Sequence, residues 1–299
     1  MIPKPKQTFQ SDSDNTNDIS LMKISDNEFE LIRSLVYNQF GISLTDQKKS
    51  LVVGRLQSLL KQKHCSTFME YYKLLTEDKT NKSLSDLINR ISTNHTFFFR
   101  EKDHFELLES TILPKIVNML REKNQTDLRI WCAACSSGEE AYCIQMTIMN
   151  YFKNDYGLWD AGLLATDISA KALEIGKTGV YPAERVTDIP KHFQNAYFSK
   201  RADGSFVAND RIRKEITFRR FNLMNEKFPF SKPFQIIFCR NVMIYFDQET
   251  RTSLVKRFCD ALVPGGYLLI GHSESIQKTS DLFDYVFPSV YQKKVKHGR

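Results

Sequence analysis

Two short segments carry residue types suited to holding a nucleoside, and each follows a run typical of a buried strand. The segment Ala133-Ala-Cys-Ser-Ser-Gly-Glu-Glu140 follows an apolar run at 128–133. Its small side chains allow the backbone to approach a ligand, and its acids lie where a helix begins. Asp167 follows a second run at 162–166, where a carboxylate can accept hydrogen bonds from both hydroxyls of a ribose. The alternative role for Asp167 is the N-cap of the next helix.

The chain lacks the signatures of a phosphate-binding loop and of a metal site. Neither G-x-G-x-x-G nor a lysine-containing phosphate loop is present, so a nucleoside without pyrophosphate fits better than NAD or ATP. Cys132 and Cys135 form a C-x-x-C pair, but zinc needs about four ligands and no second pair lies at ligand spacing. We therefore expect that the protein binds no metal and that its cysteines are reduced. His95 and His272 are expected to have no catalytic role.

The order of the predicted elements places the two segments at one edge of a sheet. Strands are expected at 128–133, 162–166, 216–220, 234–239 and 266–271, with helices at about 138–151, 169–176 and 248–262. This alternation predicts an α/β fold with a doubly wound, mostly parallel sheet, in which ligands bind outside the carboxyl ends of the strands. The run 290–293 is expected to add an edge strand, and the turn at Ala202-Asp-Gly204 predicts a β-hairpin inserted at about 196–208.

The first third of the chain has a different pattern. Residues 21–90 show helical periodicity and predict a small all-α domain, which begins at a capping box formed by Ser25 and Glu28. Before it, the polar stretch 1–20 predicts a disordered tail without a signal peptide. The α/β domain then occupies 91–299.

The net charge of +7 is thin for 299 residues, which argues against nucleic-acid binding. The excess is concentrated at 41–63, with five bases and one acid, and at 191–220, with eight bases and three acids. Either segment can be a solvated face or a docking surface for an acidic partner. No apolar stretch reaches the length of a membrane span, so a cytoplasmic protein without membrane insertion is expected.

Six segments combine these strand ends with further polar residues. They are Ser92-Thr-Asn-His-Thr-Phe-Phe-Phe-Arg100, Trp131-Cys-Ala-Ala-Cys-Ser-Ser-Gly-Glu-Glu140, Ala165-Thr-Asp-Ile168, Phe221-Asn-Leu223, Phe238-Cys-Arg-Asn-Val-Met-Ile-Tyr-Phe-Asp247 and Gly271-His-Ser-Glu274. In this order they resemble the chemotaxis receptor methyltransferase family (CheR), over about residues 25–293. Cys132, Cys135 and Ala141 stand where many members carry Ser, Ala and Pro, which are changes between small residues.

The resemblance implies an S-adenosylmethionine-dependent methyltransferase fold and a set of cofactor-binding residues. These residues are Asn94, Thr96, Arg100, Glu140, Asp167, Asn222, Leu223, Arg240 and Asn241. Carboxylates at Glu140 and Asp167 suit the ribose, the amino group and the cationic sulfonium, and Asn222 with Leu223 could read the adenine. The implied reaction gives glutamate methyl esters and S-adenosylhomocysteine.

Methylation of a glutamate needs no general base, because a carboxyl group with a pKa of about 4.3 is already ionised at neutral pH. The reaction needs alignment of carboxylate, methyl group and sulfur. Arg100 and Tyr245 are the candidates to hold the carboxylate, through a guanidinium fork and a phenol donor. The alternatives are a surface ion pair for Arg100 and a core aromatic role for Tyr245.

The resemblance also implies partners. The helical domain would meet the cytoplasmic helices of chemotaxis receptors, with Lys48 and Arg55 on one side of a helix through 45–63, and the hairpin could hold a peptide from the receptor C-terminus. Two other functions stay open, namely a nucleic-acid methyltransferase and a non-catalytic module that senses S-adenosylmethionine.

Overall fold

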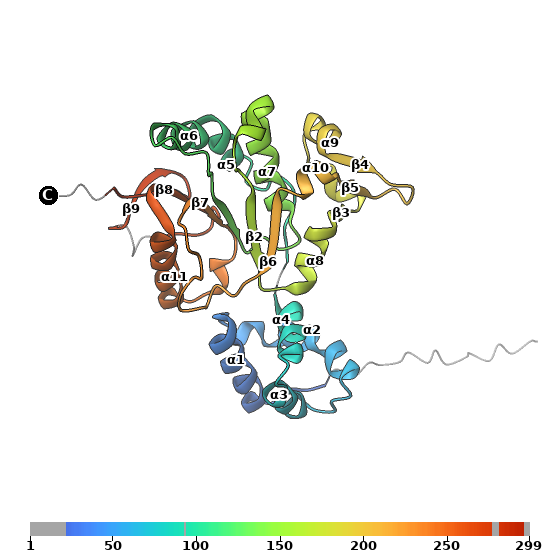
Figure 1. Ribbon diagram of the computed structural model, residues 1–299. Coiled ribbons are helices and arrows are strands. Elements are labelled where there is room, and N and C mark those ends of the chain that lie inside the picture. The colour runs from blue at the N-terminus through green and yellow to red at the C-terminus, as the bar shows by residue number, and fades with distance from the viewer. Residues whose placement is uncertain (1–21, 93, 277–280, 296–299) are drawn as a thin grey trace, which may run out of the picture.

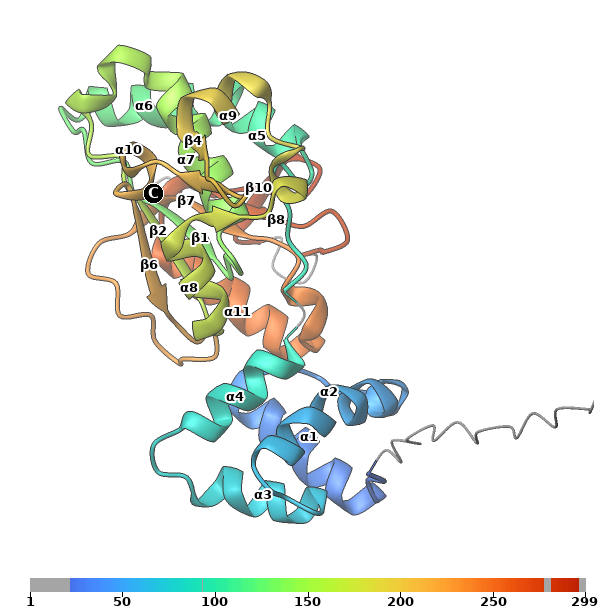
Figure 2. The ribbon, with the colours of Figure 1, turned by 90° about the vertical axis from the view of Figure 1, so that its right-hand side faces the viewer.

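The computed structural model describes residues 22–92, 94–276 and 281–295, which form a helical region and an α/β region (Figures 1 and 2). The tail predicted at 1–20 lies outside the described residues. In both views the helical region lies at one end of the α/β region, and α4 leads from one to the other. None of the helices in the described ranges combines the length and apolar character needed to cross a bilayer.

Local sequence signals set the limits of the first helix. Ser25 and Glu28 form the expected capping box, and Gly41 ends the helix with a left-handed φ of 69°. Apolar stripes on the helices of this region, including Phe29, Ile32 and Leu56, bury one another in a separate core. The elements are α1 (Asp26–Phe40), η1 (Asp46–Lys48), α2 (Lys49–Gln62), α3 (Phe68–Glu77) and α4 (Lys82–Ile91).

A seven-stranded sheet organises the α/β region, in the order β6-β2-β1-β7-β8-β10-β9. The strands are β1 (Ile130–Ala133), β2 (Leu163–Asp167), β6 (Ile216–Arg220), β7 (Phe234–Cys239), β8 (Leu262–Ile270), β9 (Phe283–Phe287) and β10 (Val290–Lys293). Strands β6, β2, β1, β7 and β8 pair in parallel. Strand β10 is antiparallel to both β8 and β9. The predicted doubly wound, mostly parallel α/β sheet is therefore confirmed.

Alternate side chains of β1 enter different cores. Ile130 and Cys132 belong to the core under α5 (Asp103–Leu107), η2 (Leu108–Ile112), α6 (Leu113–Glu122), α7 (Glu139–Phe152) and α8 (Ala170–Thr178). Trp131 and Ala133 belong to the core under α11 (Gln248–Ala261). No helix connects β6 to β7; instead, the intervening loop packs its rings around Trp131, with centroids 4.8–5.8 Å away. The alternation of strands and helices is therefore interrupted at this connection, where the sequence predicted no helix.

Two expectations about the last strands were wrong. The run 290–293 is not an edge strand, because β10 lies between β8 and β9, and β9 forms the edge. Strand β9 was not predicted; it lies at the edge of the sheet, where Tyr285 is 66% exposed. Strand β8 also begins at Leu262, before the expected start, because a register shift beside Ile236 accommodates Pro264.

The predicted hairpin forms part of a separate small sheet. Its strands β4 (Phe198–Lys200) and β5 (Phe206–Ala208) are antiparallel, and β3 (Val180–Tyr181) adds a third strand on the other side of β5. The turn residue Gly204 has a φ of 84°, as the turn signal requires. The remaining short elements of the α/β region are η3 (Lys153–Leu158), η4 (Ala183–Val186), α9 (Lys191–Tyr197), α10 (Asp210–Arg213) and η5 (Met243–Tyr245).

Candidate active site

One pocket lies at the carboxyl ends of four parallel strands, beside the helical region. The space between its lining atoms, including the part open to solvent, is about 1030 Å³, which suits a nucleoside-sized ligand. Every residue that the sequence predicts for cofactor binding or catalysis lines it. These residues are Asn94, Thr96, Arg100, Glu140, Asp167, Asn222, Leu223, Arg240, Asn241 and Tyr245. Their individual roles remain predictions.

The loop after β1 brings its backbone close to the pocket. Ala134, Ser136 and Gly138 all have left-handed backbone conformations, with φ values of 65°, 50° and 96°. A Cβ atom at Gly138 would lie 2.9 Å from the Cα of Gly176, so only glycine fits between this loop and α8. The turn directs the backbone N–H of Ser136 toward the end of β2.

Asp167 lies at the end of β2 and is 7% exposed. Its carboxylate accepts hydrogen bonds from the backbone N–H groups of Ser136 and Ser169, both at 2.8 Å. Burial raises the pKa of Asp167, and these backbone hydrogen bonds oppose that rise. The alternative N-cap role does not apply, because Ser169 caps α8 by accepting from the N–H of Ala172. We call Asp167 and Glu140 the acidic wall.

The guanidinium of Arg240 is clamped between two carboxylates. It donates to Glu140 and to Glu101, each at 2.9 Å, and its side chain is fully buried. Burial raises the pKa of Glu140, and the positive charge of Arg240 opposes that rise. The terminal nitrogens of Arg240 are thus engaged within the protein, and one of them holds Glu140 in place. No motif in the sequence indicated a role for Glu101.

Glu274 is a second buried carboxylate without a predicted role. It is 7% exposed and accepts from the backbone N–H groups of Gly271, Asn241 and Ile244, at 2.6, 2.9 and 3.2 Å. It thereby ties the end of β8 to the loop after β7, where Asn241 adopts a left-handed φ of 57°. Its position in the Gly271-His-Ser-Glu274 segment was the only available signal.

The amide of Asn222 is partly engaged at the end of β6. Its Nδ2 donates to the carbonyl of Gln39 at 2.8 Å, and its Oδ1 accepts from the N–H of Met224 at 3.0 Å. One N–H and one lone pair of the amide remain for a ligand. Beside it, Leu223 contributes an apolar surface to the pocket.

Arg100 and Tyr245, which we call the donor side, have few protein partners. Arg100 donates to the carbonyl of His95 at 2.9 Å and lies over the Phe97 ring, but it forms no ion pair with a described residue. The half-buried Tyr245 makes no hydroxyl hydrogen bond to a described residue. The Nζ of Lys48 lies 5.8 Å from the centre of the Tyr245 ring.

The helical region supplies part of the pocket, which the sequence did not predict. Phe40, Ile42 and Ile91 line it. The N–H of Ser43 donates to the carbonyl of Tyr245 at 2.9 Å, and Ile42 forms a β-bridge with Phe246. Contacts across about 200 residues leave no local pattern in a sequence, so no motif could have indicated them.

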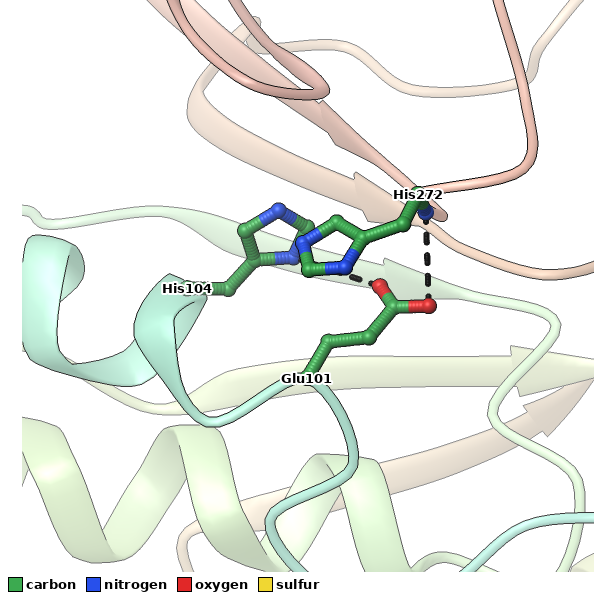
Figure 3. Close-up of side chains that lie close together, drawn as sticks. All are labelled: Glu101, His104 and His272. Carbon is green, nitrogen blue, oxygen red and sulfur yellow. Dashed lines mark hydrogen bonds and ion pairs between the residues drawn. The ribbon is translucent and has the colours of Figure 1, made fainter.

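Glu101, His104 and His272 are the one group of metal-ligand type found among the described residues (Figure 3). The geometry does not favour a cation there, because Arg240 already lies beside Glu101 and the carboxylate is hydrogen-bonded. Burial, together with the charge of Arg240, lowers the pKa of His104 to about 4, so its ring is neutral at pH 7.

The C-x-x-C pair has a structural role. Cys132 and Cys135 are buried, and the thiol of Cys132 donates to Glu140 at 3.3 Å. Burial raises the pKa of both thiols well above the usual value, so they stay protonated and unreactive.

Comparisons with known proteins agree with this arrangement. The family model described as "CheR methyltransferase, SAM binding domain" matches residues 94–291, and "CheR methyltransferase, all-alpha domain" matches 27–92. A chemotaxis protein methyltransferase of Borreliella burgdorferi is 43% identical over 93% of this chain and 99% of its own length. One of Escherichia coli is 34% identical over 90% and 92%. Among solved structures, the glycopeptide N-methyltransferase MtfA complexed with S-adenosyl-L-methionine is 18% identical over 51% and 48%, with a TM-score of 0.29.

Proposed function

The chain belongs to the CheR methyltransferase family and has its S-adenosylmethionine-binding domain, and we propose that it esterifies glutamate side chains of chemotaxis receptors. One observation carries the proposal: the acidic wall and the donor side line the same pocket. Neither Arg100 nor Tyr245 bonds to a carboxylate among the described residues. When bound, S-adenosylmethionine supplies a methyl group on a positively charged sulfur. The bonding electrons would stay with the leaving group, so the second product would be the neutral thioether S-adenosylhomocysteine.

The residues present fit this cofactor. In the proposal, Asp167 accepts hydrogen bonds from the ribose, and Glu140 attracts the positively charged groups. Both carboxylates are held in place by protein donors, so little ordering remains to be done on binding. Asn94, Thr96, Asn222, Leu223 and Asn241 complete the proposed contacts.

Arg100 and Tyr245 are proposed to orient the glutamate. Their donors can hold one carboxylate oxygen while the other attacks the methyl carbon. Because a glutamate with a pKa of about 4.3 is ionised at neutral pH, no residue of the chain has to remove a proton. The new bond is a methyl ester.

The test is transfer of a labelled methyl group to a panel of acceptors, namely a receptor cytoplasmic fragment, RNA and DNA. We expect base-labile label on the receptor fragment alone. Stable label on RNA or DNA would identify a nucleic-acid methyltransferase. Cofactor binding without transfer to any acceptor would instead favour the sensing module.

For docking, we propose that Lys48 meets the acidic methylation helices in the cytoplasm. Lys48 lies beside Tyr245 at the pocket and forms no ion pair with a described residue. The Lys48 ammonium makes one long hydrogen bond, to the carbonyl of Ser43 at 3.5 Å, whereas Lys49 pairs with Asp26 at 2.5 Å and Arg55 donates to the carbonyl of Ile91. Lys48 is therefore the residue of this group best placed to meet a glutamate.

Charge reversal tests this docking role. Lys48→Glu should raise the KM for the receptor fragment severalfold and leave cofactor affinity unchanged, because a rim charge acts on association. Lys61→Glu, at the exposed C-terminal end of α2, the helix that follows Lys48, is the matched control. Equal effects of the two substitutions would argue against a specific role for Lys48.

The inserted hairpin is proposed to tether a receptor C-terminal peptide. Strand β4 is an outer strand of the small sheet, so its free edge could accept an added strand. Tethering would raise the effective substrate concentration without contributing to the chemistry. Titration with receptor tail peptides tests it, and absence of binding at millimolar peptide would exclude tethering.

A further inference from the structure

Glu101 connects segments on both sides of the pocket although it does not line it. One oxygen accepts from Arg240 at 2.9 Å, and the other accepts from Asn241 at 3.1 Å and from the backbone N–H of His272 at 3.3 Å. Figure 3 shows the carboxylate pointing toward the two histidines, with the Nδ1 of His104 at 3.6 Å. A surface carboxylate rarely has so many partners, and the Glu101 side chain is only 13% exposed.

The backbone on both sides of Arg100 is strained. Phe99 and Glu101 have left-handed φ values of 56° and 54°. For residues with side chains this conformation is costly and persists only where neighbouring groups hold it. Here Arg240 donates to the carbonyl of Arg100 at 2.5 Å, and the N–H of Phe99 donates to the thiol of Cys143. The direction of the Arg100 side chain thus depends on contacts that hold this short segment.

The charges around Glu101 favour this arrangement. Burial raises the pKa of Glu101, but the charge and hydrogen bonds of Arg240 and the bond from Asn241 lower it to about 2. His104 is neutral at pH 7 and does not compete with Arg240 for the carboxylate. Arg240 therefore has an anionic partner on each side: Glu140 in the acidic wall and Glu101 beside the donor side.

We propose that Glu101 is a positioning residue, which holds the strained segment through Arg240 and Asn241 so that the Arg100 guanidinium faces the substrate carboxylate. This inference rests on the proposed function, because it gives Arg100 the role of substrate donor. Glu101 itself touches neither substrate nor cofactor. Its loss should misalign Arg100 without emptying the cofactor site.

A double-mutant cycle on the full chain tests this coupling. Single-turnover methyl transfer to a receptor fragment is measured at saturating cofactor for the parent, Glu101→Gln, Arg100→Ala and the double variant. Glu101→Gln should lower the rate about tenfold in the parent and less than about twofold in the Arg100→Ala background. Glu106→Gln, which removes an exposed carboxylate paired with Lys102, is the matched control and should keep the parent rate.

Two readouts besides activity accompany the cycle. Cofactor affinity by calorimetry should change less than about threefold in Glu101→Gln, and its thermal midpoint shows whether the variant is folded. If Glu101→Gln does not fold, Glu101→Asp replaces it, because it keeps the charge and withdraws the carboxylate by one methylene. We then expect a smaller loss of rate with the same dependence on Arg100.

Equal losses with and without Arg100 would overturn the inference, since Glu101 would then act independently of it. A rate unchanged in Glu101→Gln would overturn it as well. Failure of the proposed function is a separate result, because the parent protein itself would then leave the receptor fragment unlabelled.

Discussion

The acidic wall and the donor side of the pocket differ in how completely the protein satisfies them. Asp167 accepts two backbone hydrogen bonds, and Glu140 is bonded to Arg240 and Cys132. On the donor side, Arg100 has one hydrogen bond to a carbonyl, and the Tyr245 hydroxyl has none with a described residue. One half of the pocket is ordered by folding, and the other half keeps donors available.

This difference fits two kinds of ligand. A cofactor is bound in every turnover, and it binds more tightly to a site whose side chains are already ordered. The entropy cost of ordering them is then part of folding and not of binding. A substrate carboxylate gains from donors that form their strongest hydrogen bonds when the reacting atoms are aligned. Substitutions in the acidic wall should therefore change cofactor affinity, and substitutions on the donor side should change the rate of transfer.

The largest effect is expected for Arg100→Ala. Loss of the paired donor should lower the single-turnover rate roughly 100- to 1000-fold, the scale of losing a preorganised donor. Arg100→Lys should recover only part of the rate, because an ammonium lacks the planar fork. A full recovery by lysine would show that charge alone is needed.

Asp167→Ala probes the opposite half. Loss of a charged hydrogen-bond acceptor should weaken cofactor binding by about 1.5–3 kcal/mol, or roughly 10- to 150-fold. Calorimetry measures this, with Asp188→Ala, an exposed acid outside the pocket, as the control. Unchanged affinity in a folded Asp167→Ala variant would remove Asp167 from the cofactor site.

Tyr245→Phe makes a smaller change on the donor side. It keeps the ring beside Lys48 and removes only the hydroxyl. The transfer rate should fall by about 1–3 kcal/mol, or roughly 5- to 150-fold, while cofactor affinity stays constant. If the variant reacts at the parent rate, Tyr245 is structural and the donor side consists of Arg100 alone.

The smallest effect concerns stability near the clamped guanidinium. His104, which faces Glu101, Asp103, Arg240 and the His272 ring, has a pKa lowered to about 4 by burial and by Arg240. Between about pH 6.5 and 4 the unfolded chain binds a proton at this residue that the folded chain does not. His104 therefore makes the folded state less stable as the pH falls through this window, by about 1 kcal/mol per pH unit.

Thermal unfolding at pH 6.5 and 5.5 measures this contribution. The parent midpoint should fall by about 2 °C more than that of His104→Gln over this interval. His192→Gln, at an exposed position, should behave like the parent. An identical pH dependence in His104→Gln would show that His104 does not titrate below its usual range.

Much of the fold could be predicted because local signals agreed with the tertiary structure. The capping box at Ser25, the apolar runs of β1, β2, β6 and β7, and the turn at Gly204 each specify an element without distant information. The errors lie where tertiary contacts decide. Strand β9 is exposed at the sheet edge, and it was not predicted; its pairing with β10 places β10 inside the sheet.

The site residues could be predicted for two reasons. The carboxyl ends of parallel strands meet at one edge of the sheet, and the family resemblance named the residues individually. Neither source indicated Glu101, whose partners Arg240 and Asn241 lie about 140 residues away in the sequence, and Glu274 was marked only by its place in a resembling segment. Arg240 shows the limit of a motif: the residue lines the pocket as expected, but its terminal nitrogens bond to the protein. The sequence also could not predict that residues of the helical region line the pocket, because this depends on how the two regions pack together.

The most direct test of the account is the pH dependence of the single-turnover rate between pH 7 and 9, at saturating cofactor. If the site acts by aligning a carboxylate that is already ionised, the rate should be flat over this range. A rate that rises in proportion to hydroxide and then levels off would contradict the account, because it would require a general base, for which the pocket-lining His95 would be the first candidate.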